Sequence, residues 1–209
     1  MVISYMGGEC FKITQGNLTL ALNPPSKDSS LKASKFGSDI VLISLDNEDF
    51  NGVENASFGD REPFVIQGPG EYEVKEVAVR GFGSQSTYGG DKGINTIYSI
   101  SLEGMNLCFL GALDTVDIPA AAKQALDDID ILFVPVGGDG VLDHAAAYKL
   151  AVQLEPKAII PMHYGDIGGK DALKLFLKEA GEATQPIEKL TVKKKDLEGK
   201  EGEIIVLQS

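Results

Sequence analysis

The stretch IIPMHYGD (159–166) decides the expected fold, because a run of apolar residues leads directly into a short polar loop. Three other stretches repeat this arrangement, namely LISLDNED (42–49), FLGALD (109–114) and FVPVGGD (133–139). A short apolar run between turn residues is typical of a buried strand. If the four strands are neighbours that point the same way, the loops at their carboxyl ends meet at one edge of the sheet, where α/β proteins bind ligands.

We call the edge formed by these four loops the rim. The loops carry carboxylate, amide and imidazole groups, which are the usual groups of ligand and catalytic sites. We expect the following residues to gather there: Asp46, Asn47, Asp49, Asp114, Asp139, His163 and Asp166.

The rest of the sequence predicts strands and helices in alternation. Strands are expected at 2–5, 10–14, 18–22, 39–44, 63–66, 72–83, 95–102, 105–111, 131–136 and 158–162. Helices are expected at 26–36, 118–126, 143–154 and 170–180, and a β-hairpin of strands 187–192 and 203–207 around a charged turn is expected to close the chain. This order predicts an α/β fold with layered sheets and outer helices, in a single domain over residues 1–209.

The charge and hydropathy of the chain exclude several classes of protein. The 209 residues include 31 acids and 19 bases, a formal net charge of −12, and an acidic surface repels nucleic acid. No apolar run approaches the about 18 residues that a membrane span needs. The first residues, MVISYMGGECFKI, lack the basic and apolar regions of a signal peptide. We therefore expect a cytoplasmic protein that binds neither nucleic acid nor membrane.

Histidine and cysteine are scarce, with two of each in the chain. Because a zinc site takes about three or four ligands from cysteine, histidine and carboxylate side chains, this count excludes a histidine-rich metal centre. Cys10 and Cys108 both lie among strand-like apolar residues, so we expect them to be free, buried thiols.

Five motifs in a fixed order carry a resemblance to a known family: PGEYEV (69–74), GINTIYSI (93–100), FLG (109–111), FVPVGG (133–138) and PKAIIPMHYGD (156–166). In residues 2–167 the chain resembles the metallo-β-lactamase superfamily. It is most similar to the branch of small bacterial metal-dependent hydrolases related to ascorbate-6-phosphate lactonase. The resemblance implies an αββα sandwich, a metallo-β-lactamase-like fold in which the ligand loops meet at one edge.

The family's metal ligands are largely replaced in this chain. The family's H-x-H-x-D-H loop falls on residues 45–50, where only the acid matches. Its next histidine falls on Ser86, its bridging aspartate on Ala112, and the aspartate before its first proline on Asn23. The histidine of PMHY is retained. We therefore predict degenerate ligand positions at Leu45, Asn47, Asp49, Phe50, Ser86, Ala112 and His163.

These replacements predict that the chain has no catalytic residue and no cofactor. Leucine, phenylalanine and alanine offer no ligand atom, and one aspartate with one histidine does not complete a zinc site. The alternative is one weakly bound divalent metal, held by Asp49 and His163 with Asp46 or Asp114. Carboxylate oxygens of this kind suit magnesium or calcium better than zinc.

Two functions follow from these alternatives. The first is a non-catalytic protein that binds a small-molecule ligand, forms a homo-oligomer or serves a partner as a subunit. The second is a metal-dependent hydrolase of a small ester, lactone or phosphate ester, with weak or altered metal binding.

Some of these side chains also have structural explanations. Asp49 is expected to cap the loop or helix that follows it, and His163 to be either a hydrogen-bonded structural residue or part of a ligand site. A Ser–His–Asp arrangement of Ser86, His163 and Asp49 is disfavoured, because the G-x-S-x-G motif is absent. The glycine-rich stretch 81–93 predicts either a wide turn or a mobile lid.

Overall fold

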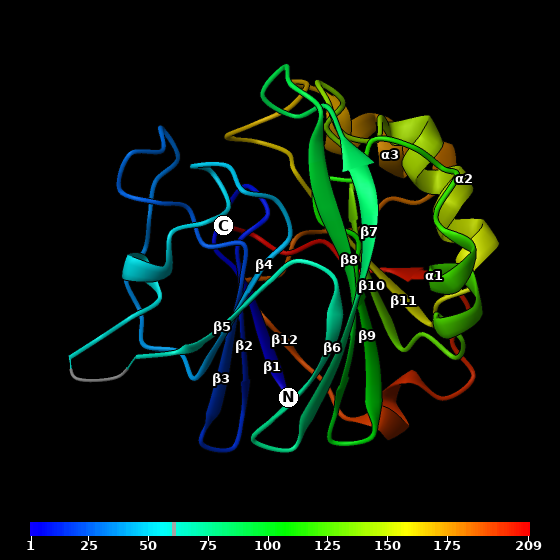
Figure 1. The fold of residues 1–209 in the computed structure, drawn as a ribbon. Helices are drawn as coiled ribbons and strands as arrows, with labels where there is room; N and C mark the ends of the chain where they lie inside the picture. The colour runs from blue at the N-terminus through cyan, green and yellow to red at the C-terminus, as the bar shows by residue number, and fades with distance from the viewer. Residues whose placement is uncertain (60–61) are drawn as a thin grey trace.

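The computed structural model describes residues 1–59 and 62–209, and its strands form two mixed sheets that pack face to face (Figure 1). The first sheet has six strands, in the spatial order β12 (Leu190–Thr191), β1 (Val2–Tyr5), β2 (Phe11–Gln15), β3 (Leu18–Leu22), β4 (Ile40–Ile43) and β5 (Phe64–Gln67). The second sheet has seven, in the order β13 (Glu203–Ile204), β11 (Ala158–Met162), β10 (Ile131–Pro135), β9 (Met105–Phe109), β8 (Gly93–Leu102), β7 (Val77–Ser86) and β6 (Gly70–Val74).

The α-helices all lie on the outer face of the second sheet (Figure 1). They are α1 (Ala120–Ala125), α2 (His144–Leu154) and α3 (Ala172–Ala180). Leu150 and Phe176 on these helices pack against Leu132 and Val134 of β10 in one buried cluster. The outer face of the first sheet is covered by irregular chain and a short 3-10 helix, η1 (Val53–Asn55). This arrangement confirms the predicted αββα sandwich, with the helical layer over the first sheet much reduced.

The main core lies between the two sheets. Its rings include Phe11 of β2, Phe109 of β9 and Phe133 of β10, all fully buried. The Phe11 and Phe133 rings meet edge to face at 4.8 Å, so this contact joins the two sheets directly. Cys10 and Cys108 are free and buried, as predicted, and burial raises the pKa of the Cys10 thiol to about 12.

Three of the four predicted rim strands are parallel neighbours, in the order β9, β10 and β11. The fourth, β4, lies in the other sheet, so the prediction of four neighbours is wrong. The two sheets nevertheless meet at the rim, because the amide of Thr96 in β8 donates to the carbonyl oxygen of Ser44 after β4 at 2.8 Å. The loops after all four strands therefore share one end of the sandwich.

The predicted helix at 26–36 is wrong, because this segment is irregular. The hydroxyl of Ser26 accepts from the amide of Asp28 at 3.2 Å, and the hydroxyl of Ser29 accepts from that of Leu31 at 2.9 Å. Serine side chains that bind nearby backbone in this way compete with helical hydrogen bonds.

The predicted strand 72–83 is two strands, β6 and β7, joined by a tight turn at Lys75 and Glu76. Both residues have positive φ, 51° and 64°, as a two-residue hairpin turn demands. The sequence lacks the asparagine or glycine that normally marks such a turn, which explains why it was not predicted.

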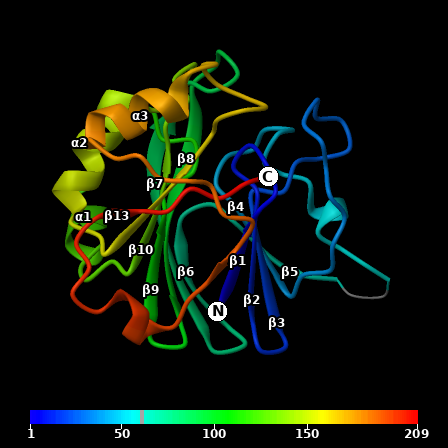
Figure 2. The same cartoon turned by 180° about the vertical axis from the view of Figure 1, so that it is seen from behind.

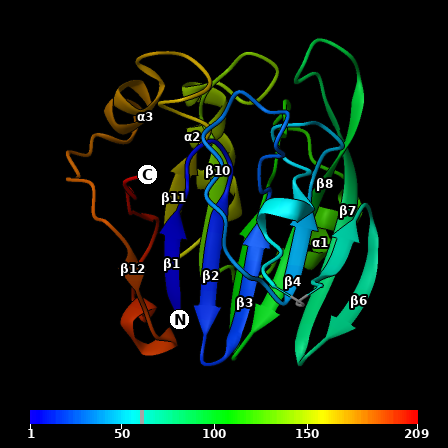
Figure 3. The ribbon, with the colours of Figure 1, turned by 90° about the vertical axis from the view of Figure 1, so that its left-hand side faces the viewer.

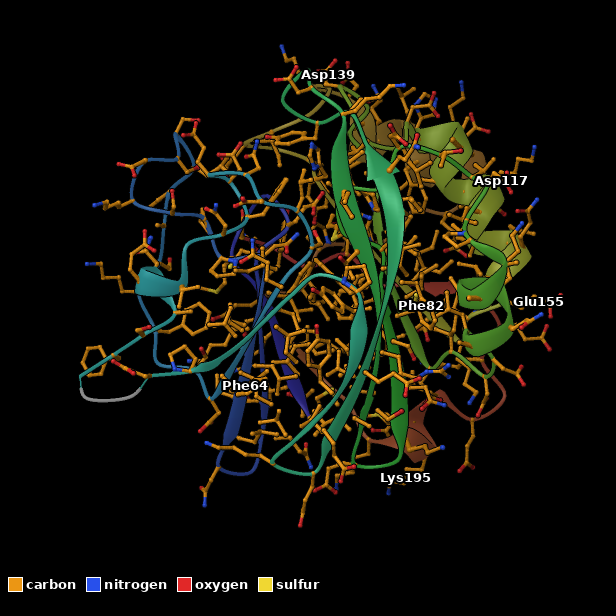
Figure 4. All side chains as sticks on the ribbon, in the orientation of Figure 1. Phe64, Phe82, Asp117, Asp139, Glu155 and Lys195 are labelled. Atoms are coloured by element: carbon orange, nitrogen blue, oxygen red, sulfur yellow. The ribbon has the colours of Figure 1, made fainter. Side chains whose placement is uncertain are left out.

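The predicted closing hairpin is also wrong. β12 pairs antiparallel with β1, whereas β13 pairs in parallel with β11 in the other sheet. Figure 2 shows the C-terminal chain crossing from one sheet to the other, and Figure 3 shows β12 beside β1. The segment between them contains the 3-10 helix η2 (Lys194–Leu197), in which Leu197 is buried in the main core. The charged stretch therefore closes the end of the sandwich opposite the rim, where Lys195 is labelled in Figure 4.

Within residues 1–59 and 62–209, no helix combines the length and apolar character that crossing a membrane requires.

The turn between β6 and β7 gives a test of stability. Glu76→Gly is expected to raise the free energy of unfolding by about 0.5–1 kcal/mol, because glycine adopts a positive φ without the steric cost of a side chain. Urea unfolding followed by circular dichroism measures this.

The matched control is Gly104→Ala in the turn between β8 and β9. Gly104 has a φ of 73°, and an added Cβ would meet no atom within 4 Å, so only the backbone is strained. This substitution should lower the free energy of unfolding by about 1 kcal/mol. A loss of stability in Glu76→Gly would contradict the account of the turn.

Candidate functional site

The rim contains a small apolar cluster built from three of the predicted ligand positions. Leu45, Phe50 and Ala112 are buried together with Val141, and the partly buried Tyr88 packs against them. Leu45 and Phe50 come from the loop after β4, whereas Ala112 follows β9. At these three predicted ligand positions, apolar side chains therefore pack against one another.

His163 directly follows β11 and is fully buried. Its amide donates to the carbonyl oxygen of Gly8 at 2.7 Å, and its φ of 62° turns the chain sharply out of the strand. Its Nδ1 lies 2.8 Å from Oε1 of Glu9, which is also fully buried. Because a carboxylate offers only acceptors, Nδ1 is the donor of this bond.

Glu9 has a second buried partner. The amide nitrogen of Asn23 donates to Oε2 of Glu9 at 2.8 Å and to the hydroxyl of Ser44 at 2.7 Å. The Asn23 oxygen accepts from the amide of Ser44 at 2.8 Å. Asn23 directly follows β3 and Ser44 directly follows β4, so residues of the first sheet hold Glu9 in place. Glu9 in turn orients His163, which follows β11 of the second sheet.

The other ring nitrogen of His163, Nε2, is buried and finds no hydrogen-bond partner among the described residues. Two aromatic rings lie beside the His163 ring, that of Tyr88, edge to face at 5.1 Å between centroids, and that of Phe50, at 6.3 Å. A buried polar atom without a partner costs about 1–3 kcal/mol, so this nitrogen is an unusual feature of the site.

Asp49 is held by two side-chain hydroxyls. Its Oδ1 accepts a short hydrogen bond from Ser29, and its Oδ2 accepts from the hydroxyl of Tyr88 at 2.6 Å. Burial, together with this bond to Asp49, raises the pKa of the Tyr88 phenol above its ordinary value, so Tyr88 stays a donor at neutral pH. Asp49 was expected to cap the loop or helix that follows it. Its side chain instead binds Ser29 and Tyr88, and so holds the segment around Ser29 and the tip of the β7–β8 hairpin.

The two remaining predicted positions bind the backbone around Asp49 and Tyr88. Asn47 Oδ1 accepts from the amide of Asp49 at 2.9 Å. The hydroxyl of the buried Ser86 accepts from the amide of Tyr88 at 3.2 Å and lies 3.5 Å from the carbonyl oxygen of Gly140, to which it donates. The disfavoured Ser–His–Asp arrangement is not formed, because the partner of His163 is Glu9.

The outer acids of the rim do not join this group. Asp46 is exposed and accepts from Asn51 at 2.8 Å, and Asp139 and Asp166 are exposed. Asp139 is labelled at the top of Figure 4, beside the tip of the β7–β8 hairpin. Asp114 lies on the wall of a separate cavity, against β7 and the segment before α1.

Sequence analysis missed two residues of this site, Glu9 and Tyr88. The signal for Glu9 was present, since it is an isolated acid between the glycine turn and the apolar strand in GGECFKI. Tyr88 lies inside the glycine-rich stretch 81–93, for which only a wide turn or a mobile lid was predicted. Tyr88 contacts Asp49 and Phe50, which are distant in the sequence, so no local sequence pattern indicates these contacts.

Comparison with known proteins identifies the family. Residues 2–163 match the model of the β-lactamase superfamily domain. A protein of Listeria innocua named as a UPF0173 metal-dependent hydrolase is 27% identical over 195 residues, covering 78% of this chain and 85% of its own. A UPF0173 protein of Pyrococcus abyssi is 25% identical, covering 82% and 87%.

A solved structure from Thermotoga maritima, described as a Zn-dependent hydrolase of the metallo-β-lactamase superfamily, superposes with a TM-score of 0.75. It is 26% identical and covers 99% of this chain and 97% of its own. The chain therefore belongs to the β-lactamase superfamily and has the metallo-β-lactamase fold.

These relatives overturn the prediction that the chain has no cofactor, or at most one weakly bound divalent metal. The Listeria innocua protein is named for dependence on metal and the Thermotoga maritima protein for dependence on zinc, so these relatives suggest a metal cofactor.

The side chains at the rim do not fit such a metal as they are arranged. Over the described ranges, no three residues among histidine, cysteine, aspartate and glutamate lie together so that they could hold an ion. Of the two retained ligand residues, Asp49 is bound by Ser29 and Tyr88, and Phe50 and Tyr88 pack beside His163.

The pair of Glu9 and His163 gives a second test of stability. Glu9→Ala is expected to lower the free energy of unfolding by about 3 kcal/mol, because it leaves His163 and Asn23 buried without their shared partner. Urea unfolding measures the loss.

The control is Glu73→Ala on the exposed side of β6, which should change the free energy of unfolding by less than about 0.5 kcal/mol. A loss below about 1 kcal/mol in Glu9→Ala would refute the importance of the buried pair.

Proposed function

We propose that this chain is a non-catalytic member of the metal-dependent hydrolase family, with a degenerate rim that acts by binding. One observation carries the proposal. The fully buried ring of Phe50 lies 4.9 Å from the ring of Tyr88 between centroids, tilted by 43°, and both rings lie beside His163. Side chains of the protein itself therefore fill the space in front of the retained histidine, where a hydrolase needs room for water and substrate.

The hydrogen bonds of the retained residues support the proposal. Both carboxylate oxygens of Asp49 accept from hydroxyls, and Nδ1 of His163 donates to Glu9. Ala112, which is fully buried, contributes only its backbone amide, donated to the side chain of Asn95 at 2.9 Å. These hydrogen bonds explain Asp49, His163 and Ala112 as parts of a packed structure, and none of the bonds requires a role in acid–base chemistry.

A metal-dependent hydrolase of a small ester, lactone or phosphate ester is the second candidate. The observation in its favour is that Nε2 of His163 has no hydrogen-bond partner in the described part of the chain, while Nδ1 is oriented by the carboxylate of Glu9. This is the arrangement in which histidines bind metals through one nitrogen and a supporting acid through the other. In this candidate Asp49 and His163 would be the ligands, with Asp46 or Asp114, and Tyr88 would have to leave Asp49.

The binding partners and the cellular location are also part of the proposal. Binding would be to a small-molecule ligand, to a second copy in a homo-oligomer or to a partner protein, by a single domain in the cytoplasm. The net charge of −12 supports the absence of nucleic acid among the partners.

An activity panel tests the proposal. Purified protein is supplied in turn with Zn²⁺, Mn²⁺ and Mg²⁺ and assayed on bis(4-nitrophenyl) phosphate, 4-nitrophenyl acetate and a simple γ-lactone. We expect rates at the buffer background, unchanged in His163→Ala and Asp49→Asn, because the rim leaves no room for a substrate beside His163.

The matched control is Asp127→Asn, an exposed acid far from the rim that should match the wild-type protein in every assay. Turnover that depends on metal and falls at least about 100-fold in both His163→Ala and Asp49→Asn would overturn the proposal in favour of the hydrolase, since that loss is typical of residues that act in chemistry.

A further inference from the structure

The tip of the β7–β8 hairpin, residues 87–92, is tied to the rest of the molecule through Tyr88. Within the hairpin, the amide of Tyr88 bonds to Ser86 and that of Gly90 bonds to Thr87. Among the described residues, the bond from the Tyr88 hydroxyl to Asp49 is the one hydrogen bond from this tip to a distant part of the chain. The side chain of Tyr88 therefore acts as the anchor of an otherwise projecting tip (Figure 1).

The backbone at Tyr88 passes very close to the loop after β10. A Cβ on Gly140 would lie 2.6 Å from Cα of Tyr88, and Gly140 has a φ of 92°, so only glycine allows this approach. Gly89 and Gly90 follow Tyr88 with φ values of 81° and 94°. Gly89 and Gly90 lack the side chains that restrict backbone rotation, and Gly140 provides the space that the inward position of Tyr88 requires.

The Tyr88 ring occupies a site with defined chemistry. The ring of Phe50 provides an apolar wall, the carboxylate of Asp49 provides an acceptor at one end, and the ring of His163 stands at the side. Nε2 of His163 is buried without a hydrogen-bond partner among the described residues, and the Tyr88 phenol gives its one hydroxyl to Asp49. A phenol that replaces the Tyr88 ring would meet the same apolar wall and the same acceptor.

We propose that Tyr88 is an internal ligand in a small-molecule site, and that this site takes an uncharged aromatic ring bearing a hydroxyl group when the hairpin tip swings outward. The inference rests on the proposed function and specifies its ligand: a phenol whose hydroxyl donates to Asp49, with its ring between Phe50 and His163. Ligand and Tyr88 compete for the same contacts, so the closed form lowers the apparent affinity of the site.

The first experiment removes the internal ligand. Tyr88→Ala is titrated with 4-methylphenol, which has the chemistry of the missing side chain, and with toluene, which lacks only the hydroxyl. Calorimetry should show one saturable site for 4-methylphenol, with a dissociation constant at least about tenfold below that for toluene, because only the phenol can donate to Asp49.

Two variants control for non-specific binding. Tyr72→Ala removes a partly buried tyrosine from β6, away from the rim, and should create no site of this preference. In Tyr88→Ala combined with Asp49→Ala, the preference for 4-methylphenol over toluene should disappear. Equal binding of the two probes to Tyr88→Ala, or no binding of either, would overturn the inference.

The second experiment uses the wild-type chain, so that it does not depend on the folding of a variant. The protein is labelled with 3-fluorotyrosine, and the Tyr88 signal is assigned by its loss in Tyr88→Phe. Addition of 4-methylphenol should move or split this fluorine signal in a saturable manner, while toluene should not. An unchanged Tyr88 signal up to the solubility limit of 4-methylphenol would contradict displacement.

The two proposals fail in different ways. Metal-dependent turnover in the activity panel would overturn the non-catalytic function, whereas the binding of 4-methylphenol would still be measured directly. Failure of 4-methylphenol to bind would remove the phenol site, and the activity panel would still decide whether the rim is catalytic.

Discussion

The buried pair of Glu9 and His163 is the interaction on which the rim depends. Glu9 comes from the turn between β1 and β2 in the first sheet, and His163 directly follows β11 in the second. Asn23 extends the pair to Ser44 at the end of β4, so one carboxylate fixes the ends of strands from both sheets. A buried charge is tolerated only with such partners, which makes the relative position of the sheets at this end a condition for stability.

The packing at the rim follows from that fixed frame. With Nδ1 of His163 held by Glu9, the rings of Phe50 and Tyr88 pack beside its imidazole. The chain has the metallo-β-lactamase fold, and within it the loops at the rim bind one another through Phe50, Tyr88 and Asp49, since fold and site are constrained separately.

Sequence patterns predicted most of the strands because each pattern is local. The apolar runs that become β4, β9, β10 and β11 are recognisable within a few residues, and so is the family resemblance they carry. Glu9 and Tyr88 were missed because their partners are distant in sequence, 154 residues away for His163 and 39 for Asp49. The helix predicted at 26–36 failed for a local reason, since Ser26 and Ser29 bind the backbone that a helix would need. The ligand positions inferred from the resemblance remain predictions, although most of them lie around Tyr88.

The path of the C-terminal segment has a consequence for the order of folding. Strand β1 pairs on one side with β2, which follows it closely, and on the other with β12, where Val2 faces Thr191. In synthesis from the N-terminal side, one edge of β1 therefore stays bare until residues 190–191 have been made. Contacts of such high sequence separation slow folding, and unpaired edges promote aggregation while they last. The two-residue strand β12 therefore covers this edge of β1 late in synthesis, and truncation before β12 would leave the edge of β1 exposed.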